Sequence, residues 1–194
     1  LLLEKTDAYI ETVLDTLRQT GLEEDTIVVF TTDHGEMMGS HGLISKTNFY
    51  EESAKTMMLV RQPGRIAPGA VNDSAFVGTA DLMPTMLDLC GLPVPAGLDG
   101  RSFKAQCCGK DDGRFTELFA VNPDGRMLRF GDYKYVHSIV YGEEHHTLFD
   151  LAADPDETTN VFNQPGYEAV SDDVHRRLTA WLEQENLSVT FDPI

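Results

Sequence analysis

Apolar residues recur at two spacings along the chain, and these spacings predict helices and strands. Near the start, the apolar residues at positions 10, 13, 14 and 17 follow the i, i+3, i+4, i+7 spacing of one helix face. Gly21 stands where such a helix would end, and the β-branched run at 26–31 predicts a buried strand. The first part of the chain is therefore predicted to be a helix followed by a strand.

A second strand and a second helix are predicted farther along the chain. The apolar run at 56–60 predicts another buried strand, and residues 75–77 are short and strand-like. Asp81 is the expected N-cap of a helix that ends at Gly91. The helix face expected to be buried consists of Leu82, Thr85, Met86 and Leu89.

Beyond the polar, glycine-containing segment 104–114, short apolar runs alternate with turn residues. This spacing predicts a small antiparallel sheet, followed by an amphipathic helix at about 171–185, with strands at 115–121, 127–131, 133–138 and 147–151. The predicted fold class is therefore α/β. We expect a partial mixed sheet flanked by helices in residues 1–103, and a small C-terminal antiparallel sheet with a terminal helix in residues 104–194.

Composition narrows the class of protein. The 194 residues, 41% of them hydrophobic, are enough for one domain with a sizeable core or one with a small appendage. A formal charge of −17 argues against a general nucleic-acid surface, and no apolar run is long enough to span a membrane. The three cysteines are expected to be free thiols, since their odd number does not favour a disulfide framework. The sequence supports no prediction of the compartment.

Candidate chemistry is concentrated between Thr31 and Glu52. The predicted strand at 26–31 delivers Asp33 and His34 to its carboxyl end, where ligands collect in open α/β sheets. A carboxylate beside an imidazole is a plausible half of a metal site. Lys46 follows on a glycine-rich connection that folds back toward the same place. A metal and a lysine together suit an oxyanion ester, either sulfate or phosphate.

Other polar groups have simpler interpretations. Asp81, Asp99 and Arg101 are expected to be structural, and the acidic turn 154–157 lacks the spacing and glycine of a calcium-binding EF-hand loop. His145 and His146 are expected in an exposed turn, because adjacent histidines in a strand would point to opposite faces.

Four segments in a fixed order resemble the C-terminal half of sulfatases, within the alkaline-phosphatase-like superfamily. TIVVFTTDHGEMMGSHGLISKTNFYEES resembles the family's strand, metal loop and sulfate-binding lysine, and MMLVRQPGRIAPG its next strand and turn. DLMPTMLDLCGLPVPAGLDGRSF is similar to its aspartate-capped helix. YKYVH and TLFDLAADPDETTNV resemble its late strands and the Asp-Pro-x-Glu-x-x-Asn turn.

The resemblance implies hydrolysis of a sulfate ester and assigns roles to residues. Asp33 and His34 match metal ligands, with Ca²⁺ the first expectation and Mg²⁺ or Mn²⁺ as alternatives. Lys46 matches the catalytic lysine that contacts the sulfate. His41 lies near a position where relatives carry His-Gly, so it either lines the substrate pocket or caps the loop. The implied partners are a sulfate-ester small molecule or a sulfated glycan.

The family's nucleophile motif, C-x-P-x-R or S-x-P-x-R matured to formylglycine, does not occur in these 194 residues. We therefore expect the chain to be a fragment, inactive alone, whose missing N-terminal half supplies that nucleophile and further metal ligands. Two alternatives stay open. The same groups serve a phosphodiesterase or phosphonate monoester hydrolase of the superfamily, and a non-catalytic stand-alone module would need none of them.

Overall fold

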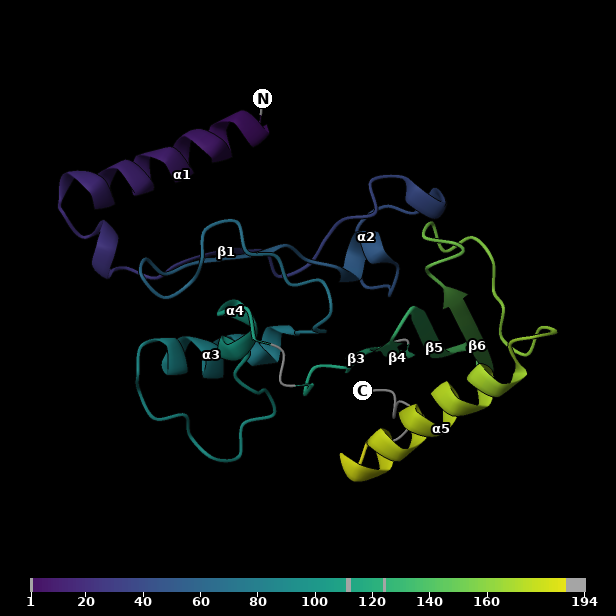
Figure 1. Cartoon of the computed structure of the whole chain (residues 1–194). Coiled ribbons are helices and arrows are strands. Elements are labelled where there is room, and N and C mark those ends of the chain that lie inside the picture. The colour runs from purple at the N-terminus through teal and green to yellow at the C-terminus, as the bar shows by residue number, and fades with distance from the viewer. Residues whose placement is uncertain (1, 111–112, 124, 188–194) are drawn as a thin grey trace.

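The computed structural model describes residues 2–110, 113–123 and 125–187. It has the predicted α/β character, with helices around two antiparallel sheets. In Figure 1 helix α1 (Leu2–Gln19) lies apart from the other elements, and helix α5 (Glu168–Gln184) crosses the C-terminal sheet. The described part of the chain contains no helix long and apolar enough to cross a membrane.

The first sheet is a pair, β1 (Val28–Thr31) and β2 (Met58–Arg61), aligned antiparallel with Phe30 opposite Leu59. Both predicted strands are present, but they are not fully buried: Phe30 is 37% and Leu59 62% exposed. No other described strand pairs with them, which leaves part of the apolar surface open.

Short elements surround this pair. They are the 3₁₀ turns η1 (Glu23–Asp25), η2 (Ser40–Gly42) and η3 (Thr79–Asp81), and helices α2 (Glu51–Ala54), α3 (Leu82–Leu89) and α4 (Lys104–Cys107). The predicted strand at 75–77 is not formed; Phe76 donates one backbone hydrogen bond, to the Phe115 carbonyl. Helix α3 ends at Leu89, and Gly91, the predicted stop, follows two residues later with φ at +72°.

Asp81 precedes α3 but does not cap it with its side chain. Its carboxylate instead accepts hydrogen bonds from the backbone nitrogens of Gly78 (2.8 Å) and Arg101 (2.7 Å). Asp81 therefore joins the 3₁₀ turn η3 to the connection that follows α3. Its structural role is as expected, but its partners are different.

The second sheet is the predicted antiparallel meander, in the order β3-β4-β5-β6. Its strands are β3 (Glu117–Asn122), β4 (Gly125–Phe130), β5 (Tyr133–Val140) and β6 (Glu143–Asp150). Helix α5 packs on one face and buries a core of Leu128, Tyr135, Leu148, Val174, Leu178 and Leu182. Burial of these side chains provides the main hydrophobic stabilisation of this part.

A buried ion cluster joins this sheet to α2. The Lys134 ammonium lies 2.7 Å from Glu157 and 2.5 Å from Glu51, and it donates to the Phe49 carbonyl at 2.8 Å. The side chains of Lys134 and Glu157 are both 1% exposed. Glu157 also accepts a hydrogen bond from the Glu51 backbone nitrogen, at 2.7 Å.

The acidic turn 154–157 holds Glu157 in place, in agreement with its predicted structural role. Asp154 accepts hydrogen bonds from the backbone nitrogens of Thr158 and Thr159, both at 2.8 Å. Glu157 itself has a φ of +52°, in the left-handed region that a non-glycine residue seldom adopts. The turn therefore keeps an unfavourable backbone conformation in order to direct this carboxylate toward Lys134.

Replacement of Lys134 tests the strength of this cluster. Lys134→Met should lower the free energy of unfolding by ~3–5 kcal/mol, because it leaves the Glu157 carboxylate buried without its cation. The matched control is Lys55→Met, since Lys55 lies 3.7 Å from the same Glu51 but is 74% exposed. It should change stability by less than ~0.5 kcal/mol in urea denaturation. Equal losses in the two variants would contradict the special role of Lys134.

Candidate functional site

The loop between β1 and α2 carries all the predicted site residues, and backbone hydrogen bonds close it. The Gly35 nitrogen donates to the Ser53 carbonyl at 2.8 Å, and the Met37 nitrogen donates to the Ser45 carbonyl at 2.9 Å. Met37 is 1% exposed and anchors the loop in the interior. These contacts bring the residue before Lys46 against the segment that follows Asp33 and His34.

The backbone of this loop is strained. Four of its non-glycine residues have φ between +48° and +79°, namely Met38, His41, Ser45 and Thr47. Such conformations cost of order 1–3 kcal/mol each, persist only where the surroundings impose them, and cluster at functional sites. The strain therefore supports a functional role for the loop on grounds that are independent of sequence pattern.

The side chains of Asp33 and His34 lie beside each other, with a carboxylate oxygen close to a ring nitrogen. His34 Nδ1 is 2.7 Å from the Gly35 carbonyl oxygen, which can only accept, so Nδ1 carries the hydrogen. In the neutral ring, His34 Nε2 then presents a lone pair 3.4 Å from Asp33 Oδ2. Two acceptors at this distance repel each other unless a cation lies between them.

The Asp33 carboxylate is exposed and ionised. Its side chain is 84% exposed, and hydrogen bonds from the backbone, including one from the His34 nitrogen at 3.0 Å, hold the pKa of Asp33 below its usual range. No Lys or Arg side chain among the described residues forms an ion pair with it. The donor set therefore fits a divalent cation, which a carboxylate oxygen and an imidazole nitrogen both ligate.

His41 is placed at the turn of the loop and held by α2. Its ring stacks on Tyr50 with centroids 3.8 Å apart, and its Nε2 lies 3.9 Å from Glu52. Backbone and Ser40 hydrogen bonds, together with His41, lower the pKa of Glu52 despite some burial. The His41 side chain is only 17% exposed, so one ring edge at most is available to a substrate.

Lys46 is exposed, and its ammonium makes no hydrogen bond or ion pair with any residue that the structure describes. In a chain with a net charge of −17, such a free cation is an available point of attraction for an anion. The structure thus groups Asp33 with His34 and His41 with Glu52, and leaves Lys46 unengaged on the same loop.

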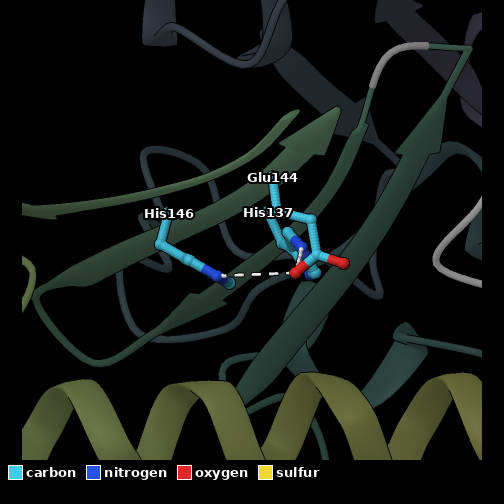
Figure 2. Close-up of side chains that lie close together, drawn as sticks. All are labelled: His137, Glu144 and His146. Carbon is cyan, nitrogen blue, oxygen red and sulfur yellow. Dashed lines mark ion pairs between the residues drawn. The ribbon is translucent and has the colours of Figure 1, made fainter. Parts of the chain in front are cut away.

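A second group of polar residues was missed by sequence reasoning. His137, Glu144 and His146 place potential metal-ligand atoms within 4.8 Å of one another, as Figure 2 shows. His145 and His146 had been expected in an exposed turn, but both lie inside β6, and His146 pairs directly with His137 on β5. The Tyr141-Gly142 turn could have revealed this pairing from the sequence. A two-residue hairpin turn fixes the register of its strands, and this one places His137 opposite His146.

Other residues considered from the sequence have structural roles. The Arg101 guanidinium lies 4.8 Å from the centre of the Phe115 ring. Its backbone nitrogen donates to Asp81, so both its side chain and its backbone are engaged within the fold. The three cysteines are unpaired in the structure.

Comparison with known proteins gives a consistent result. The family described as "N-sulphoglucosamine sulphohydrolase, C-terminal" matches residues 39–184. Arylsulfatase K of Bos taurus is 35% identical over 170 residues, which cover 81% of this chain and 31% of that protein. The chain thus spans about a third of the length of this relative.

Two solved structures show the same fold. The protein BT4656, in complex with its substrate D-glucosamine-2-N,6-O-disulfate, superposes with a TM-score of 0.79 at 25% identity, covering 92% of this chain and 38% of that one. The phosphonate monoester hydrolase SpPMH from Silicibacter pomeroyi has a TM-score of 0.80 at 27% identity, with the same coverage of 92% and 38%.

A glycine substitution tests whether the fold of the loop positions the site. A Cβ atom at Gly35 would lie 1.8 Å from the Glu52 carbonyl oxygen, so Gly35→Ala must displace backbone. We expect a loss of ~3 kcal/mol, the upper end of over-packing costs, in urea denaturation. Gly78→Ala is the control, since its Cβ would meet side-chain atoms and no backbone, Leu118 at 3.1 Å and Asp81 at 3.9 Å, and it should cost less than ~1 kcal/mol. A loss at Gly35 no larger than at Gly78 would contradict this role.

Proposed function

The chain belongs to the sulfatase family that is described as N-sulphoglucosamine sulphohydrolase, C-terminal, and on this premise we propose that it forms the C-terminal part of a sulfuric ester hydrolase. In this proposal Asp33 and His34 hold a divalent metal, and Lys46 binds the sulfate group. The close approach of Asp33 Oδ2 and His34 Nε2, 3.4 Å apart, is the observation that carries the proposal.

The roles of these residues follow from their contacts. The Gly35 carbonyl fixes the His34 ring through Nδ1, which leaves Nε2 as the ligand atom. The metal, most simply Ca²⁺ with Mg²⁺ or Mn²⁺ as alternatives, would supply positive charge that polarises a sulfate oxygen and activates the nucleophile. Lys46 brings a free ammonium that can neutralise charge developing on the leaving oxygen.

His41 is proposed as a substrate-binding residue whose ring is held in place by its neighbours. The Tyr50 ring and the Glu52 carboxylate orient its imidazole, so its available edge can donate a hydrogen bond to a sugar hydroxyl or sulfate oxygen. The nucleophile, expected to be formylglycine, would come from a part of the protein outside these 194 residues. We further propose residues 1–103 as part of the catalytic domain and 104–194 as its C-terminal subdomain.

The substrate class is proposed from the relatives. BT4656 was solved with a sulfated glucosamine, so a sulfated sugar is the first candidate, ahead of a smaller aryl sulfate. A phosphonate monoester is the second candidate, because SpPMH superposes equally well and an Asp-His pair with a lysine suits either oxyanion. Rates toward 4-nitrophenyl sulfate and 4-nitrophenyl phenylphosphonate, measured side by side, distinguish the two.

Lys46→Ala tests the oxyanion role in the protein expressed from its complete coding sequence. Loss of a group that stabilises developing charge should lower kcat/KM for the sulfate ester by ~10²–10³-fold. Lys55→Ala is the control, because Lys55 is also an exposed lysine and its ammonium pairs with Glu51. If both variants keep full activity, Lys46 is not the sulfate-binding residue.

Asp33→Asn tests the metal site in the same protein. The amide keeps an oxygen that accepts the His34 backbone hydrogen bond but loses the negative charge. We expect lower metal content by elemental analysis and a parallel loss of hydrolysis, with Asp25→Asn on the exposed turn η1 unchanged. Normal metal content and activity in Asp33→Asn would contradict the proposed ligand set.

A further inference from the structure

The β5–β6 hairpin gathers three side chains on the sheet face beside α5. His137 and His146 are opposite each other in the register, and Glu144 lies two residues before His146 on the same strand. Residues two apart on a strand share a face, so all three side chains point the same way. Figure 2 shows them converging next to the helix, with the two imidazole rings 4.4 Å apart between centroids.

The distances within this group are close to those of a bound ion. Glu144 Oε2 lies 3.5 Å from His137 Nε2 and 3.9 Å from His146 Nε2. Ligand atoms on a tetrahedral zinc ion, each ~2.0–2.1 Å from the metal, are separated by about 3.3 Å. Small side-chain rotations therefore suffice to bring the three atoms to coordination distance.

His137 has a buried ring nitrogen that makes no hydrogen bond. Its side chain is 6% exposed, and its Nε2 is buried and makes no hydrogen bond. An unsatisfied buried polar atom is rare and destabilising. The Glu144 carboxylate oxygen lies 3.5 Å from it, and a metal ion held between the two would satisfy this nitrogen.

A second layer of contacts fixes the ring of His146. The Tyr135 hydroxyl lies 2.7 Å from His146 Nδ1 and 2.8 Å from His175 Nδ1 on α5. Both bonds form when His146 Nδ1–H donates to Tyr135 and Tyr135 donates to His175. The reverse direction, from His175 through Tyr135 to His146, also forms both bonds. A metal ion would select the first assignment, in which His146 Nε2 presents a lone pair toward Glu144 and Tyr135 holds the ring from behind.

We propose that His137 Nε2, His146 Nε2 and the Glu144 carboxylate bind one zinc-class divalent ion. Two imidazoles and one carboxylate favour Zn²⁺, Co²⁺ or Ni²⁺ over Ca²⁺, which prefers an all-oxygen shell. The site lies on the C-terminal sheet, separate from Asp33 and His34 on the β1–α2 loop, and does not depend on sulfate hydrolysis. Glu144, 60% exposed, provides the route of entry from solvent. The ion would link β5 to β6 beside α5.

The test is zinc binding by the complete protein after chelator dialysis. Titration calorimetry with ZnCl₂ alone should show a site of micromolar affinity or tighter that remains in Asp33→Asn, whose proposed catalytic metal site is impaired. Glu144→Gln and His146→Gln should each weaken it by at least the ~10–100-fold that loss of an outer-shell partner costs. Glu144 is exposed, so Glu144→Gln should fold normally. His145→Gln is the matched control, because the neighbouring His145 points to the opposite face and should leave zinc binding unchanged.

Asp33→Asn separates this site from the proposed catalytic one. It should leave zinc affinity at the sheet unchanged, whereas Glu144→Gln should leave hydrolysis unchanged. Absence of stoichiometric zinc in the unmodified protein would overturn the proposal. So would zinc binding of equal affinity in Glu144→Gln, His146→Gln and His145→Gln.

Discussion

The ion cluster around the Lys134 ammonium connects the C-terminal sheet to helix α2, and the position of the candidate site depends on it. Lys134 lies in the C-terminal sheet, yet its partners are a carboxylate from the 154–157 turn, a carboxylate at the start of α2 and the Phe49 carbonyl. A buried charge must be paired, so this cation allows little freedom to the three segments that surround it. The loop carrying Asp33, His34 and Lys46 ends at α2. Its position therefore depends on Lys134 and Glu157, which lie more than eighty residues later in the sequence.

The position of the loop also has an electrostatic consequence. The chain carries 32 acidic and 15 basic residues, a field that repels any anionic substrate at long range. An anion must therefore be held by cations close to it, and the described part of the loop offers one uncommitted ammonium together with a cation-seeking Asp-His pair. Binding of an anionic substrate should therefore depend on how well it fits these local groups, because the net charge of the chain does not attract it.

The local elements were largely predictable from the sequence, because they depend on spacing and turn residues. The meander from β3 to β6, helix α5 and the end of α3 just before Gly91 all follow from patterns within short windows. The Asp33–His34 pair was found because the two residues are adjacent. Their role as ligands, and the division at residue 103, stay predictions.

The long-range contacts were not predictable in the same way. Lys134 and Glu157 are both charged residues, which pattern analysis assigns to the surface, and only the folded turn brings them together. His137 and His146 became partners through the register that the Tyr141-Gly142 turn imposes. A slip of β6 by one residue against β5 would have placed His146 on the opposite face of the sheet from His137.

The left-handed backbone of Glu157 has a consequence for how this position can vary. Glycine is the residue that a φ of +52° favours, and glycine would also abolish the carboxylate that pairs with Lys134. Asparagine, the next best choice for the backbone, is too short and uncharged. The backbone conformation and the ion pair therefore favour different amino acids at position 157, so few substitutions there should be tolerated. Replacement of Glu157 would leave Lys134 without its buried partner, so among related sequences we expect residues 134 and 157 to change together or to stay the same.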